Sequence, residues 1–94
     1  MPGLIVSSSA LRISIDRGGT FTDCVCKVPD KDDIVVKILS VDPKNYSDAP
    51  SEAIRQVLSK YYGREIPRGT KLDLKDVGEL SLITALSKIH RNRG

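Results

Sequence analysis

Apolar and polar side chains alternate along residues 11–16, which is the period-two pattern of a β-strand with one buried face. Residues 21–28 are rich in aromatic, β-branched and cysteine side chains and predict a second strand. A turn rich in aspartate at 29–33 leads into IVVKIL at 34–39, which predicts a third strand. Because both connections are short, we expect antiparallel neighbours and a three-stranded meander.

A helical pattern follows the connection at 40–50. Asp48 can cap the first turn, Pro50 is tolerated within it, and Gly63 supplies a stop. One helical face is apolar and the opposite face is polar, with Ala53, Ile54, Val57, Leu58 and Tyr61 on the first and Glu52, Arg55, Gln56 and Ser59 on the second. We expect this helix to lie across the sheet with its apolar face buried.

The last part of the chain predicts a second amphipathic helix. Four apolar residues recur there at helical spacing, namely Leu80, Ile83, Leu86 and Ile89. The chain has 94 residues, of which 39% are hydrophobic, and this suits one small α/β domain with a thin aliphatic core. We interpret 1–10 as a loose leader, 11–77 as a partial domain with one or two helices on its sheet, and 78–94 as a divergent helical tail.

The charge and the lengths of the apolar runs argue against two classes of function, nucleic-acid binding and membrane association. Fifteen Lys and Arg against twelve Asp and Glu give a net charge of +3, with the signs mixed along most of the chain. The basic cluster at 88–93 has no interleaved aromatic residues to stack on bases, so no specific nucleic-acid binding is expected. No stretch approaches the roughly 20 apolar residues of a membrane span, and no secretory signal is present. We therefore expect no membrane association and a cytoplasmic location.

The two cysteines, Cys24 and Cys26, lie two positions apart in the second predicted strand and so share one face. Neighbouring positions along one strand are poorly placed for a disulfide, and two cysteines without a histidine cluster do not make a zinc site. We interpret both as buried thiols of a reducing compartment.

Candidate chemistry is concentrated in DRGGTFTD at 16–23, between the first two predicted strands. The glycine pair is typical of a hairpin turn, because two-residue loops need a positive φ that glycine accepts. Exposed backbone amides at such a turn, together with threonine hydroxyls, can cradle phosphate oxygens. The candidate phosphate-binding residues are Gly18, Gly19, Thr20 and Thr22.

Asp16 adds a metal hypothesis to this turn. Its carboxylate would repel a phosphate unless a cation stood between them, and Mg²⁺ takes one or two carboxylates together with waters and phosphate oxygens. Asp16 is therefore the candidate metal ligand. The alternative is a solvated hairpin in which Asp16 and Asp23 only cap strand ends, since short glycine motifs often carry no function.

Four segments together resemble the N-terminal part of eukaryotic-type 5-oxoprolinases in the hydantoinase/oxoprolinase family. They are IDRGGTFTD at 15–23, KILSVDP at 37–43, NYSDAP at 45–50 and IPRG at 66–69. The resemblance covers about 11–77. The first segment alone also fits hydantoinase-like and acetone-carboxylase-like members, and a shorter version occurs in sugar kinases. The three later segments favour the 5-oxoprolinases.

The resemblance implies a partial actin-like ATPase domain, which has the ribonuclease H-like fold. It implies ATP-dependent hydrolysis of 5-oxo-L-proline to L-glutamate, a reaction of glutathione metabolism, by a homodimeric full-length protein. ATP and Mg²⁺ are the implied cofactors, and nucleotide and 5-oxoproline the implied partners. Asp16 would hold the metal, and the four phosphate-binding candidates would contact the nucleotide.

This chain carries one phosphate loop of such a domain, and the resemblance implies that the catalytic residues lie beyond Gly94. We therefore expect an inactive fragment of a hydrolase family. That the fragment binds neither ATP nor Mg²⁺ when alone stays open as an alternative. Two alternatives from other classes stay open. One is a non-catalytic module with weak Mg-nucleotide affinity, and the other is an interaction fragment with an uncovered sheet face.

Overall fold

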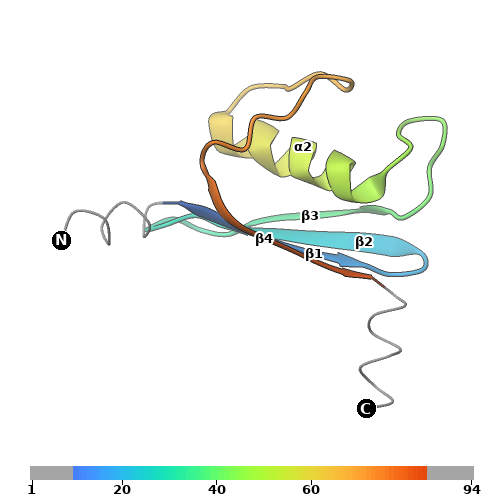
Figure 1. Cartoon of the computed structure of the whole chain (residues 1–94), viewed down its shortest axis with the longest axis horizontal. Helices are drawn as coiled ribbons and strands as arrows, with labels where there is room; N and C mark the ends of the chain where they lie inside the picture. Colours follow the sequence, from blue (N-terminus) through green and yellow to red (C-terminus); the bar gives the residue numbers. More distant parts are fainter. Residues whose placement is uncertain (1–9, 85–94) are drawn as a thin grey trace, which may run out of the picture.

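The computed structural model describes residues 10–84, which form one sheet with a helix on one of its faces (Figure 1). The confirmed α/β fold contains, in chain order, β1 (Leu11–Arg17), β2 (Phe21–Lys27), β3 (Ile34–Leu39), α2 (Ala49–Tyr62) and β4 (Val77–Thr84). Three predictions fall outside the described residues: positions 1–9 of the expected leader at 1–10, the helical tail beyond residue 84 and the basic cluster at 88–93.

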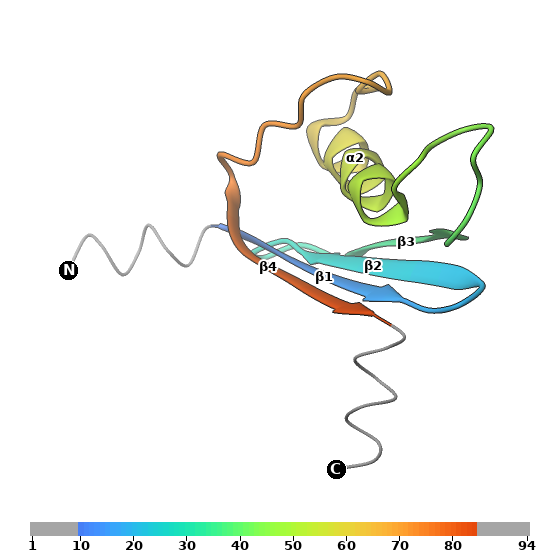
Figure 2. The same ribbon diagram turned by 45° about the vertical axis from the view of Figure 1, so that its right-hand side comes forward.

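The sheet has the strand order β3-β2-β1-β4. β1 pairs antiparallel with β2, and β2 antiparallel with β3, which confirms the predicted meander. β4 pairs parallel with β1, after a crossover through α2 (Figure 2). A meander followed by a crossover helix and a parallel fourth strand is the arrangement of a partial ribonuclease H-like domain, the fold class expected from the sequence.

The predicted helical tail at 78–94 is wrong for residues 78–84, which belong to the strand β4 instead. Leu80 and Leu82 alternate with Glu79 and Ser81, so these residues also fit a period of two. The open edge of β1 decides between the two patterns. The parallel register shifts between Leu11 and Arg12, opposite Gly78. A Cβ at Gly78 would lie only 2.5 Å from the Cβ of Ala10, so the close approach of β4 to β1 requires glycine there.

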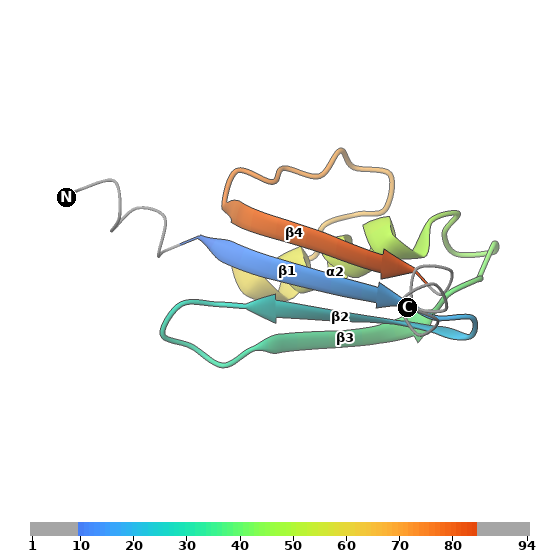
Figure 3. The ribbon, with the colours of Figure 1, turned by 60° about the horizontal axis from the view of Figure 1, so that its bottom comes forward.

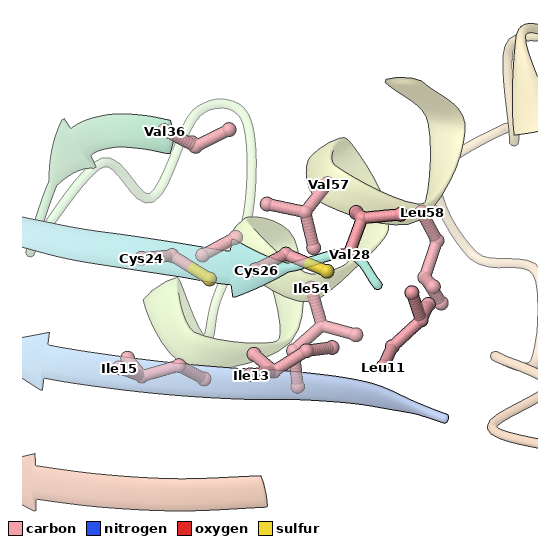
Figure 4. Close-up of a cluster of buried hydrophobic side chains, with 11 residues drawn as sticks. Leu11, Ile13, Ile15, Cys24, Cys26, Val28, Val36, Ile54, Val57 and Leu58 are labelled. Atoms are coloured by element: carbon pink, nitrogen blue, oxygen red, sulfur yellow. The ribbon is translucent and has the colours of Figure 1, made fainter. Parts of the chain in front are cut away.

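The hydrophobic core lies between the sheet and α2 (Figure 4). Leu11, Ile13 and Ile15 of β1 point into it and meet Cys24, Cys26, Val57 and Leu58. Both cysteines are buried and free, which confirms the prediction of two buried thiols. Because strand side chains alternate, the even-numbered residues of β1 lie on the opposite face, which α2 does not cover.

The ends of α2 follow the predicted signals. The carboxylate of Asp48 accepts a hydrogen bond from the Ser51 amide at 3.0 Å and so caps the N-terminus. Gly63 ends the helix in the left-handed conformation with φ 72°, and its amide donates to the carbonyl of Ser59. No helix within residues 10–84 is long and apolar enough to span a membrane.

The expected polar face of α2 needs a correction, because Glu52 and Arg55 are buried. Arg55 donates to both carboxylate oxygens of Glu52, from Nη2 at 2.6 Å and from Nε at 3.0 Å. Arg68, from the loop that follows α2, also donates to both oxygens. The ion pair lets two charges lie inside the protein and ties the loop to the helix.

Candidate functional site

The candidate site is the β1–β2 turn formed by residues 18–20. The Gly18 amide donates to the carbonyl of Phe21 at 2.9 Å and closes the turn. Below it, Arg17 lies opposite Thr22 and Asp16 lies opposite Asp23 in the antiparallel ladder. The predicted hairpin is therefore confirmed, and all predicted site residues lie in or next to its turn.

The reason for the two glycines differs from the sequence expectation. Within residues 10–84 the glycines with left-handed φ are Gly63 and Gly69, so neither turn glycine needs a positive φ. Gly18 is needed for space, because a Cβ there would lie 3.0 Å from the carbonyl oxygen of Phe21. A Cβ at Gly19 would have no atom of the chain within 4 Å. The missing side chain of Gly19 therefore leaves open space in front of the turn.

Two backbone amides of this turn are available to a ligand. Within residues 10–84, the amides of Gly19 and Thr20 donate no hydrogen bond to the protein. Both residues are exposed, and they border the open space at Gly19. Successive free amides at a turn form the kind of concavity that binds phosphate oxygens.

Two carboxylates, Asp16 and Asp23, are directly paired between β1 and β2. They belong to the sheet face opposite the core residues Ile15 and Cys24. Figure 3 shows that face of the sheet in front of α2, which leaves it uncovered. Directly paired residues of antiparallel strands place their Cβ atoms about 4.5–5.5 Å apart on one face, so two like charges meet here. Asp16 is half-buried and Asp23 is exposed. A cation between them would relieve the repulsion, and this arrangement fits the expected Mg²⁺ ligand while adding Asp23, which the sequence analysis treated only as a cap.

No cluster of three or more metal-ligating side chains occurs within residues 10–84. Mg²⁺ does not need one, because it retains several waters and uses one or two carboxylates together with phosphate oxygens. The donor set of the turn therefore fits Mg²⁺ held with a nucleotide better than a metal caged by protein ligands alone.

Thr22 lies elsewhere than the sequence suggested. Its side chain is fully buried on the α2 side of the hairpin, and its hydroxyl oxygen lies 2.8 Å from the Ser40 hydroxyl oxygen. The exposed Thr20, by contrast, follows directly on Gly19. Sequence reasoning missed Ser40, although a serine directly after a predicted strand and within the KILSVDP segment was the available signal.

A separate surface hollow of about 520 Å³ lies between the 45–48 connection, the first turn of α2 and the loop at 68–72. Glu52, Arg55 and Arg68 line it, whereas no residue of the hairpin does. The guanidinium and carboxylate groups in its wall are already hydrogen-bonded to one another. The hollow is thus distinct from the glycine turn.

The strand order, with a glycine hairpin at the β1–β2 turn, defines the class of protein as a partial α/β domain of a kind compatible with nucleotide binding. A family profile described as the hydantoinase/oxoprolinase N-terminal region matches residues 12–85, a range that takes in β4. The chain therefore belongs to the hydantoinase/oxoprolinase family and corresponds to its N-terminal region. No solved structure matches the chain.

Several curated relatives carry the name 5-oxoprolinase. One from Saccharomyces cerevisiae is 50% identical over 80 residues, or 82% of this chain and 6% of the relative. One from Pestalotiopsis fici is 48% identical over 82% of this chain and 6% of the relative. 5-Oxoprolinase 1 of Arabidopsis thaliana is 53% identical over 71% of this chain and 5% of the relative. The chain thus spans about a twentieth of the length of these relatives.

Proposed function

We propose that this chain is the first phosphate-binding part of an ATP-dependent 5-oxoprolinase, which hydrolyses 5-oxo-L-proline to L-glutamate. The observation that carries the proposal is the turn itself, where the free amides of Gly19 and Thr20 border space left open by a missing side chain. The names of the curated relatives support the substrate. ATP and Mg²⁺ belong to the proposal as the ligands that fit this turn.

The chemistry explains why a nucleotide is needed. A lactam carbonyl is a poor electrophile, and transfer of the terminal phosphoryl group of ATP to its oxygen, with release of ADP, creates a phosphate leaving group. Water then adds to the activated carbon and the C–N bond breaks, which opens the ring and leaves an acyl phosphate. A second water releases the phosphate and gives L-glutamate. Bound Mg²⁺ supplies neutralisation of the phosphate charge in such transfers. The contribution of this chain is to hold and orient the phosphates.

Each turn residue has a proposed role. The amides of Gly19 and Thr20 and the Thr20 hydroxyl donate to phosphate oxygens, and Gly18 permits the close turn. Asp16, with Asp23 beside it, holds the cation through water. Thr22, whose hydroxyl is engaged with Ser40, supports the turn from behind.

The chain alone is proposed to bind without turnover. Useful acceleration requires substrate, nucleophile and opposing phosphate donors to be held together, and the described residues supply a single loop. The full-length protein is proposed to be a cytoplasmic homodimer, in keeping with the free thiols of Cys24 and Cys26.

A second candidate function is an interaction fragment. The open face of the sheet exposes Phe21, Leu39 and Val35, the last of which is 62% exposed. On the other face, Leu80 and Leu82 of the edge strand β4 are also half exposed. Uncovered apolar faces and open strand edges favour association. Concentration-dependent self-association that nucleotide does not alter would favour this candidate.

Titration of the purified chain with Mg-ATP tests the first proposal, with backbone amide resonances as the readout. We expect the Gly19 and Thr20 resonances to move, and Asp16→Asn to weaken this response. Asp32→Asn is the matched control, because Asp32 is exposed in the β2–β3 turn at the far end of β2. No movement at millimolar Mg-ATP would overturn phosphate binding by this turn. Release of glutamate from 5-oxoproline by the chain alone would overturn the expectation of binding without turnover.

A further inference from the structure

We propose that Ser40 is a positioning residue that aims the Gly19 amide at the phosphate, an inference that rests on the proposed function for its ligand. Ser40 directly follows β3, comes from outside the hairpin and is only 5% exposed. It is the point where the end of β3 holds the glycine turn.

All the polar atoms of Ser40 are used on the hairpin. Its amide donates to the Thr20 carbonyl at 2.8 Å, and its hydroxyl donates to the Gly18 carbonyl at 2.7 Å. Its own carbonyl accepts from the Arg17 guanidinium at 3.3 Å. One residue thus holds the turn on both sides of Gly19.

The direction of the hydrogen bonds follows from the number of protons. A serine hydroxyl has one proton, which Ser40 donates to Gly18, so in the contact with Thr22 the Thr22 hydroxyl is the donor. The relay therefore runs from Thr22 to Ser40 to the Gly18 carbonyl. The buried Thr22 hydroxyl acts through this relay rather than at the surface of the turn.

Because the peptide bond is planar, the hydrogen bond to the Gly18 carbonyl also sets the direction of the Gly19 amide. The Gly18 carbonyl and the Gly19 amide belong to one planar trans peptide, so they point in opposite directions. When Ser40 holds the Gly18 oxygen on the inner side of the turn, it holds the Gly19 N–H toward the outside. It also keeps the Gly18 and Thr20 carbonyl oxygens away from an anion that they would repel.

The test uses Ser40→Ala, Ser40→Thr and, as a matched control, Ser47→Ala, an exposed serine in the connection that follows Ser40. The readouts on the full 94-residue chain are the Gly19 amide resonance without nucleotide and the dissociation constant for Mg-ATP. Ser40→Ala is expected to move the Gly19 resonance and to raise the dissociation constant for Mg-ATP about tenfold. A change of this size corresponds to the loss of roughly one hydrogen bond to a charged group. Ser40→Thr keeps the hydroxyl and is expected to restore both values, and Ser47→Ala to change neither.

The two readouts separate this inference from the proposed function. If the unaltered chain binds no Mg-ATP, phosphate binding fails, and the Gly19 resonance still decides the positioning role. An unchanged Gly19 resonance in folded Ser40→Ala would overturn the inference, as would unchanged Mg-ATP affinity when the unaltered chain binds. If Ser40→Ala does not fold, Ser40→Cys supplies a near-isosteric side chain with a weaker donor, and the same shift is expected at smaller size.

Discussion

The carboxylate of Glu52 and the guanidinium of Arg55, one turn apart on α2, form a two-pronged ion pair inside the protein, with Nη2 of Arg55 2.6 Å from Oε2 of Glu52. Arg55 also donates to the Ile66 carbonyl at 2.6 Å, and Arg68 reaches the same carboxylate from the loop. The pair therefore fixes the loop between α2 and β4, on which the placement of the fourth strand depends.

Glu52→Ala is expected to destabilise the protein by about 3–5 kcal/mol, because it leaves the Arg55 guanidinium buried without its main partner. Urea denaturation measures this loss. Glu79→Ala is the control, since Glu79 and Arg12 form an ion pair whose side chains are mostly exposed and which is worth less than about 1 kcal/mol. Equal losses for the two variants would contradict the assignment of a buried pair.

Stability is expected to fall in acid through the same carboxylate. Hydrogen bonds from Arg55 lower the pKa of Glu52 from 4.5 to about 2, with smaller contributions from Gln56 and Arg68, and burial opposes them. A carboxyl group whose pKa is lower in the folded state stabilises that state above its unfolded pKa. This contribution is complete above about pH 4.5 and is lost as the pH falls toward 2. The free energy of unfolding should therefore change less between pH 6 and pH 3 in Glu52→Gln than in the unaltered chain, as measured by urea denaturation at each pH.

The thiols are expected to be unreactive in the folded protein. Burial, with a smaller contribution from the neighbouring Cys26, raises the pKa of Cys24 to about 11. Burial, followed by the charge of Asp33, also raises the pKa of Cys26. Because the thiolate is the reactive form, a thiol reagent at pH 7.5 should modify the native chain slowly and the urea-unfolded chain rapidly. Rapid modification of the native chain would contradict this.

The two turn glycines are expected to respond differently to alanine. Gly18→Ala should lower stability, because its Cβ would meet the Phe21 carbonyl at 3.0 Å. Gly19→Ala should change the free energy of unfolding by less than about 0.5 kcal/mol, as for a surface substitution. It should weaken the binding of Mg-ATP, because the added methyl group enters the open space in front of the turn. Thermal unfolding and the amide titration measure the two effects. Undiminished Mg-ATP affinity in Gly19→Ala would contradict a phosphate at that position.

Gly78→Ala is expected to weaken the attachment of β4 to β1. The added Cβ would lie 2.5 Å from the Cβ of Ala10, so the strands must separate locally. Amide hydrogen exchange should show faster exchange in β4 with little change in the β2–β3 ladder. Equal loss of protection throughout the sheet would instead indicate global destabilisation.

Local patterns were enough to predict the meander, the caps of α2 and the hairpin at 16–23. Strand alternation, Asp48 and Gly63 act over a few residues, and their neighbours in sequence are also their neighbours in space. The same holds for the buried thiols, because strand alternation places Cys24 and Cys26 on one face. The candidate phosphate turn was predicted for this reason as well.

Contacts between segments that are distant in sequence decided the features that local patterns did not predict. Residues 77–84 are a strand because β1 offers an open edge, and no local period distinguishes this from a helix. Glu52 is buried because Arg68, sixteen residues away, donates a hydrogen bond to its carboxylate. Part of the predicted polar face of α2 therefore lies inside the protein. Ser40 holds the glycine turn from twenty-two residues beyond Gly18. The sequence by itself determined the elements and the turn, and the tertiary structure determined their partners, because hydrogen bonds and ion pairs between remote residues form only once packing brings them together.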